Sequence, residues 1–583
     1  MKKLIIPICI LVLTLVGCEK DFLDLKPLDT VTEAAFFTKP EHFELAANGF
    51  YSQLVSWRPT NGSNIYDFMD FGSDLTAWPQ DLGRGSNLAG NDDPYWTTTY
   101  RYLRDVNILL KKAENYPGDK SEITKYVAEA HFFRAWHHFF LLQRFGGVPI
   151  VTSVLDLDSP ELYGPRNSRY EVINLVLSDL DVAIEGLPTE QNISGADKGH
   201  ISKWAAEGIK AKVLLYEATW EKNVGVSTDF AGSGGPTGSN INTFLDGAIQ
   251  YSASVIDNGG YELWNYNSVL NNLSSYFLFN LEDGGSNIAG LDKTTNKEFI
   301  MQSIYDFTLR QGGINLSHTV AGRLSPDRKM LDLFLASDGL PIAKSPLFEG
   351  YNKTSDEFKN RDLRMMAYFG TDIPEDGSVK LPGSSGNTTG TGIEARKFRT
   401  FNYGVYRAAK EESSNYPHLR LAEVYLIYAE ALFERDGAIS DADLDKSINK
   451  IRERAGLPPL TNLFVSSNGL NMLQEIRNER AIELYAEDNR FNDLKRWGIA
   501  EEALNAPIIG MVIEGTEYET NTSLYDPSSY IYGETPVETA EGVRNAVVID
   551  PGSNRNFTRK NYLFAIPSRQ INLNPELVQN PGW

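Results

Sequence analysis

The stretch at residues 121–145 reads SEITKYVAEAHFFRAWHHFFLLQRF and predicts a helix that is apolar on almost every side. A helix with this pattern is buried, because it has no polar face to present to water. Ser121 is the expected N-cap, and the GGVP run at 146–149 is expected to end the helix. We therefore place it at the centre of the core, through Phe132, Phe133, Ala135, Trp136, Phe139, Phe140, Leu141 and Leu142.

Helical periodicity continues on both sides of this stretch. Helix pairs that recur at roughly 35 to 45 residues predict a mainly α fold with a tetratricopeptide-like body. Periodicity weakens in 261–415, which predicts an irregular, loop-rich subdomain laid on that body, and the tail 499–583 is expected to be mostly loop. The expected helices are 41–57, 94–116, 170–184, 202–220, 242–256, 419–434, 443–455, 471–487 and 490–497.

The N-terminus predicts a lipoprotein leader. Residues 1–24 read MKKLIIPICILVLTLVGCEKDFLD, with Lys2 and Lys3 before a short apolar run and Gly17 directly before Cys18. The run is shorter than the roughly 20 residues that span a bilayer, and it fits a cleaved secretory signal. Leu-Val-Gly-Cys resembles the bacterial lipobox, so Cys18 is expected to carry lipid and to begin the mature chain.

Five parts are expected along the chain. They are the signal peptide 1–17, the lipid-anchored tether 18–40, a helical region 41–260, the irregular subdomain 261–415, and a second helical region with its tail, 416–583.

Composition excludes several classes of function. The formal net charge is −22, which disfavours binding to nucleic acid, because phosphates are bound by Lys and Arg. The two cysteines are Cys9, which leaves with the signal, and Cys18, which takes lipid, so no disulfide or cysteine-based metal site is expected. No cofactor is predicted. A structural calcium ion stays open, because the loops are rich in Asp and Asn but carry no EF-hand pattern.

Catalytic motifs are not found either. His137 and His138 are adjacent and so point to different helix faces, and His131 does not complete the i, i+4 pair of a helical metal site. The sequence has no Gly-x-Ser-x-Gly elbow and no P-loop. The 28 Tyr, 29 Phe and 9 Trp side chains instead suit stacking on flat ligand faces such as those of sugars.

Five blocks of sequence, in this order, resemble the SusD/RagB family of Bacteroidetes outer-membrane lipoproteins. They are CEKDFLDLKP at 18–27, RAWHHFFLLQRFGGVPIVT at 134–152, RLAEVYLIYAEAL with INKIRERAGL within 420–457, IRNERAIELYAEDNRFNDLKRWG at 476–498, and YLFAIPSRQINLNPELVQNPGW at 562–583. The resemblance is poor across 58–93, 221–240 and 261–415.

The resemblance implies a tetratricopeptide helical body whose loops and irregular segments form the ligand face. It implies a non-catalytic binding protein, lipid-anchored in the outer membrane and facing the cell exterior. The aromatic and Asn-rich loops favour a glycan as its ligand. The implied partner is a SusC-like TonB-dependent transporter, over which the lipoprotein sits as a lid. Glu19-Lys20-Asp21 is similar to the acidic signal that sends such lipoproteins to the surface.

Three other functions stay open from the sequence. The RagB branch of the family implies peptide capture in place of glycan capture. A surface glycoside hydrolase would show turnover, which the resemblance argues against. A structural lid would make no ligand contacts of its own.

The charged residues within the shared blocks are interpreted as scaffold. Arg480, Glu483 and Arg490 could clamp a ligand, but a buried ion-pair network that fixes helix packing is the favoured interpretation. Trp583 is expected to pack on the body.

The ligand site is instead predicted in the divergent loops, where specificity can vary. A Trp ring offers a flat face to a sugar, and neighbouring Asp and Arg can make charge-assisted hydrogen bonds to hydroxyls. Each ring also has a competing interpretation as an anchor of its own loop. The candidates are Asp74, Trp78 and Arg84 in the loop 59–93, Trp264, Tyr266 and Tyr276 around an Asn-rich run, and, with less support, Tyr305 and Arg323.

Overall fold

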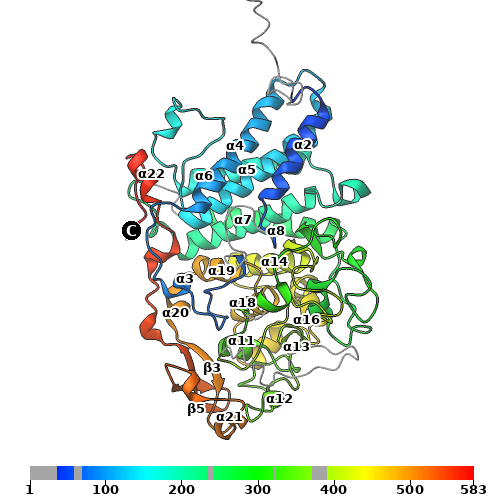
Figure 1. Cartoon of the computed structure of the whole chain (residues 1–583), viewed down its shortest axis with the longest axis vertical. Helices are drawn as coiled ribbons and strands as arrows, with labels where there is room; N and C mark the ends of the chain where they lie inside the picture. Colours follow the sequence, from blue (N-terminus) through cyan, green and yellow to red (C-terminus); the bar gives the residue numbers. More distant parts are fainter. Residues whose placement is uncertain (1–35, 58–67, 234–239, 321–322, 370–389) are drawn as a thin grey trace, which may run out of the picture.

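A computed structural model describes residues 36–57, 68–233, 240–320, 323–369 and 390–583. The protein is mainly helical with few strands, which confirms the predicted fold class (Figure 1). The predicted signal peptide, Cys18 and the tether up to residue 35 lie outside the described residues. Among the helices of the described ranges, none is both long enough and apolar enough to cross a membrane.

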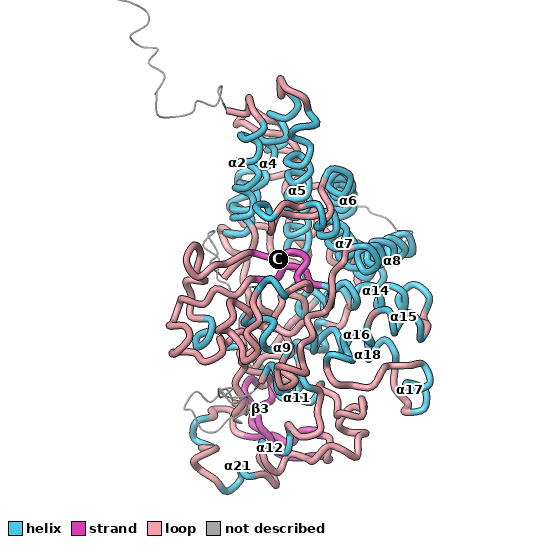
Figure 2. Tube along the Cα trace, turned by 90° about the vertical axis from the view of Figure 1, so that its right-hand side faces the viewer, coloured by secondary structure: helices cyan, strands magenta, loops and turns pink. Residues whose placement is uncertain are grey.

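The longer helices are α2 (Pro40–Phe50), α4 (Pro94–Glu114), α5 (Thr124–Phe145), α6 (Arg169–Gly186), α7 (Lys203–Asn223), α8 (Ile241–Asn258), α14 (Leu421–Asp436) and α18 (Met472–Glu483). They pack largely in chain order, with α5 between α4 and α6, and α7 between α6 and α8 (Figures 1 and 2). Helix α14, from the second helical region, packs on α7, α8 and α18, so the two helical regions of the sequence share one body.

Helix α5 is the buried centre that its sequence predicts. Phe132 and Leu142, for example, are fully buried in the largest apolar cluster. The predicted start is wrong, because a 3-10 turn (Lys120–Ile123) precedes the helix. Asp119 caps that turn by accepting the backbone N–H of Ser121 at 2.9 Å, and this takes the capping role from Ser121 itself.

The middle of the chain is irregular, as expected, and its described residues contain one strand and several short helices. Strand β1 (Phe299–Ser303) pairs antiparallel with β2 (Tyr416–Arg420). The expected second helical region therefore begins with a strand at residue 416, and its first helix begins at Leu421. The shorter helices of the chain are α3 (Asp81–Arg84), α9 (Ser274–Phe277), α11 (Arg328–Leu333), α12 (Thr354–Glu357), α13 (Leu363–Tyr368), α15 (Asp441–Lys446), α16 (Ile448–Arg454), α17 (Asn462–Ser467), α19 (Arg490–Arg496), α20 (Ala500–Asn505), α21 (Glu517–Thr520) and α22 (Ser568–Leu573).

The tail contains a three-stranded antiparallel sheet in the order β3-β5-β4, where mostly loop and no sheet was expected. The strands are β3 (Ile508–Val512), β4 (Glu534–Thr539) and β5 (Gly542–Asp550). β4 alternates exposed and half-buried residues, and this weak apolar pattern is hard to recognise in a sequence. The last residue packs as expected, since the Trp583 ring N–H donates to the Lys560 and Leu563 carbonyls at 3.1 and 3.0 Å.

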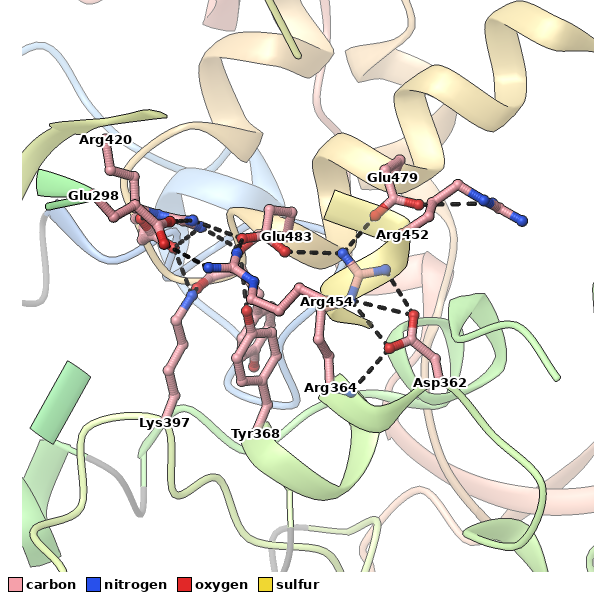
Figure 3. Close-up of polar contacts among 12 residues, drawn as sticks. Glu298, Asp362, Arg364, Tyr368, Lys397, Arg420, Arg452, Arg454, Glu479 and Glu483 are labelled. Atoms are coloured by element: carbon pink, nitrogen blue, oxygen red, sulfur yellow. Dashed lines mark hydrogen bonds and ion pairs between the residues drawn. The ribbon is translucent and has the colours of Figure 1, made fainter. Parts of the chain in front are cut away.

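A buried network of ion pairs joins the irregular subdomain to the helices (Figure 3). Glu483 of α18 accepts from Arg364 of α13 at 2.9 Å and from Arg420 of β2 at 2.6 Å, and it pairs with Arg454 of α16. Glu298 pairs with the last two arginines at 2.8 and 2.5 Å. All five side chains are at most 1% exposed, so their charges are balanced by protein groups, which include Asp362, Glu479 and Glu487, and not by water.

The three charged residues interpreted as scaffold are all ion-paired, although not with one another. Glu483 belongs to the network above, Arg480 donates to Asp493 at 2.8 Å, and Arg490 donates to Asp74 at 2.8 and 2.9 Å. Their partners are protein carboxylates and guanidinium groups, which supports a structural role over a ligand clamp.

Candidate functional site

Two short segments that are far apart in the sequence lie side by side and bring predicted site residues together. Residues 74–78 and 323–327, which we call the paired segments, are joined at a bridge between Thr76 and Pro326. The Ala77 N–H donates to the Ser325 carbonyl at 2.9 Å. This pairing brings two of the candidate ligand residues, Trp78 and Arg323, to one part of the surface. Nothing in the sequence of either loop predicted that the two would meet.

Trp78 and Arg323 meet on the paired segments. The Arg323 guanidinium carbon lies 5.6 Å from the centroid of the Trp78 ring, within the range of a cation–π contact. Trp78 is 43% exposed. The ring is therefore both oriented by a neighbouring cation and accessible to a ligand.

Asp74 lies at the other end of the paired segments and is buried. Its carboxylate accepts from Arg490 at 2.8 and 2.9 Å and pairs with Lys329. Burial on its own would raise the pKa of Asp74, but Arg490 and Lys329 hold it well below its usual range. The charge of Asp74 is thus engaged inside the protein.

A cavity of about 190 Å³ lies beside Asp74, between the paired segments and strand β3. Asp327 and Lys329 line it together with Ile508. Burial raises the pKa of Asp327 to about 7, and the charge of nearby Asp74 acts in the same direction.

The titration of Asp327 should make the stability of the protein depend on pH. Its carboxyl is harder to ionise in the folded state, so wild-type stability should fall as pH rises from about 4 to about 7. Asp327→Asn keeps an acceptor for the Met330 N–H, which now bonds at 2.8 Å, but has no ionisable group. We expect the variant to match wild type near pH 4 and to unfold at a higher temperature near pH 8, in thermal melts across this range.

The exposed Asp526→Asn is the control for this pH series. Asp526 also accepts a backbone N–H, that of Ser528 at 2.9 Å, but its pKa is lowered, chiefly by its hydrogen bonds to Ser528. A stability difference between Asp327→Asn and wild type that does not change with pH would contradict the prediction.

Arg84 makes an ion pair within the protein. Its guanidinium donates two hydrogen bonds to Asp550 of β5, at 3.0 and 2.7 Å, and the carboxylate of Asp550 is fully buried. Arg84 therefore links α3 to the tail sheet.

Three of the predicted aromatic ligand residues lie in the interior. Trp264 is 2% exposed, and its ring N–H donates to Thr295 Oγ1 at 3.0 Å. Tyr276 is buried and its hydroxyl donates to the Arg399 carbonyl at 2.7 Å, while Tyr305 is 1% exposed. Protein atoms cover their rings, so these three residues are not part of the exposed surface around Trp78 and Arg323.

Tyr266 has an intermediate position. It is half-buried and packs on Trp264, with the two ring centroids 5.0 Å apart. It supports the core ring and is not placed beside Trp78 or Arg323 by any contact that the structure describes.

Several exposed aromatic rings were not among the predicted ligand residues. Tyr163, Phe307 and Tyr532 are 55%, 42% and 41% exposed. No local signal marks them, because exposure depends on how distant segments cover each ring and not on residue type.

A further cavity lies elsewhere, on the helical body. It has a volume of about 610 Å³ and lies among α4, α5 and α6, with His131 and Arg134 in its lining. None of the predicted site residues borders it. Across the described part of the chain, no group of three His, Cys, Asp or Glu side chains could hold a metal ion.

Comparison with known proteins agrees with this fold. A family model described as "SusD family" matches residues 288–583, and one described as "Starch-binding associating with outer membrane" matches residues 21–215. A SusD-like protein of Bacteroides ovatus is 24% identical over 515 residues, which are 85% of this chain and 83% of that protein.

Two solved structures illustrate the similarity of fold. A SusD-like carbohydrate-binding protein of Bacteroides fragilis superposes with a TM-score of 0.67 at 22% identity, covering 93% of this chain and 99% of that one. A structure solved with xylogluco-oligosaccharide has a TM-score of 0.56 at 20% identity, covering 94% of this chain and 98% of that one. With the SusD family model matching 296 of its 583 residues, the chain belongs to the SusD family, a family of non-catalytic binding proteins.

Proposed function

We propose that this protein is a surface-exposed lipoprotein, anchored in the outer membrane through Cys18, that captures a glycan and delivers it to a SusC-like TonB-dependent transporter. The lipobox at the N-terminus and the family description that names outer-membrane association support the location. The relative described as carbohydrate-binding and the one solved with a xylogluco-oligosaccharide support the ligand class.

The observation that carries the proposal is the exposed Trp78 ring with Arg323 beside it. A pyranose has faces formed by C–H groups, and a flat indole matches such a face in shape and polarity. Charged groups at the edge of such a ring can bond to the sugar hydroxyls more strongly than neutral groups can. Trp78 is thus the proposed stacking residue of the site, and Arg323 orients its ring.

The test is native affinity electrophoresis of the mature lipoprotein in detergent, through gels that contain different polysaccharides. Removing the ring in Trp78→Ala should cost about 1 kcal/mol of stacking, so the dissociation constant should rise roughly five-fold without a change in melting temperature. Tyr163→Ala, which removes an exposed ring elsewhere, is the matched control and should behave as wild type.

Unchanged retardation of Trp78→Ala would refute this site. If no polysaccharide retards the wild-type protein, and calorimetry shows heat on adding peptides, the ligand is a peptide and the glycan proposal fails.

A further inference from the structure

An arginine lies between two aromatic rings on the irregular subdomain, away from the paired segments in sequence. The Arg407 guanidinium carbon is 4.1 Å from the centroid of the Phe307 ring and 3.9 Å from that of the Tyr406 ring. Arg407 is 8% exposed, whereas Phe307 is 42% exposed. We call Phe307, Tyr406, Arg407 and the adjoining Asp283 the aromatic platform.

The aromatic platform is held in place by hydrogen bonds beneath and beside it. Arg407 donates to Glu282 at 3.0 Å and to Asp283 at 2.8 Å. The Tyr406 hydroxyl donates to the other oxygen of Asp283 at 2.7 Å. Tyr406 and Arg407 are therefore held before any ligand arrives, and Arg407 gives the Phe307 ring a fixed surface to pack on, which reduces the entropy lost on binding.

We propose that the aromatic platform is a second glycan-binding surface and that it takes a neutral pyranose. The exposed Phe307 ring offers a stacking face, and the Asp283 side chain, 60% exposed, offers a carboxylate that accepts from sugar hydroxyls. This inference rests on the proposed function, because it concerns another contact with the same class of ligand.

The preference for a neutral sugar follows from the charges of the platform. The cation in direct contact with the rings, Arg407, is buried and already pairs with Glu282 and Asp283. The exposed charge of the aromatic platform itself is the Asp283 carboxylate, which would repel a uronate or a sulfate ester. Arg310, three residues after Phe307, is also exposed, but its guanidinium carbon lies 4.5 Å from the Tyr305 ring and its side chain donates to the Ile304 carbonyl.

The same loops carry two other exposed apolar side chains, Leu309 and Val405. The competing interpretation is therefore that this surface binds another protein. A protein contact would depend on such apolar tips as much as on the ring. A sugar would depend on the flat ring alone, and this difference allows the two uses to be separated.

The test compares Phe307→Ala with Leu309→Ala in the mature lipoprotein, by affinity electrophoresis through xyloglucan, which is neutral, and polygalacturonate, which is a uronate polymer. We expect the dissociation constant for xyloglucan to rise about three- to ten-fold in Phe307→Ala and to stay unchanged in Leu309→Ala. Polygalacturonate should retard the wild-type protein less than xyloglucan does.

A second variant, Phe307→Leu, keeps apolar bulk and removes the flat ring, so it should lose as much affinity as Phe307→Ala. It tests the role of the ring even if the small Ala side chain disturbs the fold. Wild-type affinity in Phe307→Leu, or equal losses in Phe307→Ala and Leu309→Ala, would overturn the inference, as would stronger retardation by polygalacturonate. If Trp78→Ala weakens binding and Phe307→Ala does not, this inference fails while the proposed function stands. If no glycan retards the wild-type protein, both fail.

Discussion

Replacing Glu483 by glutamine is expected to lower the free energy of unfolding by about 3 to 5 kcal/mol, the typical effect of removing one partner of a buried ion pair. Glu483 is the shared acceptor of Arg364, Arg420 and Arg454 (Figure 3). Glutamine keeps the size of the side chain but not its charge, so three buried guanidinium groups lose a neutralising carboxylate. Chemical unfolding of the purified variant measures the effect.

The stability lost in Glu483→Gln should also depend on pH, because the pKa of Glu483 is shifted. Burial on its own would raise the pKa of Glu483, but the three arginines hold it well below the usual 4.5. The wild-type advantage should therefore be full above about pH 4.5 and shrink as pH falls below that value.

The control for Glu483 is Glu453→Gln. Glu453 is exposed on α16, one residue before Arg454, and should change the stability by no more than about 0.5 kcal/mol. Equal stabilities of the two variants would show that the network does not depend on the Glu483 charge.

Trp264→Ala is expected to destabilise the protein by about 3 to 5 kcal/mol, because it removes a buried indole and leaves a cavity. Trp264 is 2% exposed within a second apolar cluster, which also contains Leu270, Leu273 and Phe277, and its ring N–H donates to Thr295 Oγ1. Thermal unfolding measures the loss, and glycan affinity should be compared at a temperature where the variant is still folded.

Trp78→Ala is the matched comparison, since the same residue type is replaced at a site that is 43% exposed. It should weaken glycan binding with little effect on the melting temperature, the reverse of Trp264→Ala. A Trp264→Ala variant as stable as wild type but defective in glycan binding would return Trp264 to the ligand site.

The candidate site could be predicted from the sequence only in part. Trp78 was singled out because an indole in a polar loop is a plausible stacking group, and its exposure agrees with that interpretation. Asp74 and Arg84 were chosen for their charge, but each is neutralised by a partner more than four hundred positions away, Arg490 and Asp550 respectively. Such distant pairing leaves no trace in the local pattern.

The sequence by itself determined the features that depend on neighbouring residues. The 3.6-residue periodicity of a helix is local, so the helices of the body, with α5 at its centre, could be read from it, and the five blocks were enough to recognise the SusD family. The tail sheet was not predicted, because β4 has only a weak apolar pattern and the partners of β3 and β5 are set by the fold.

Only the tertiary structure decided which aromatic rings face water and which charges are paired. Trp78 and Trp264 are the same residue type in similar polar loops, yet one is exposed beside Arg323 and the other is covered by the second apolar cluster. The physical reason is that burial and ion pairing are set by segments far apart in the chain, which meet only when the whole protein folds.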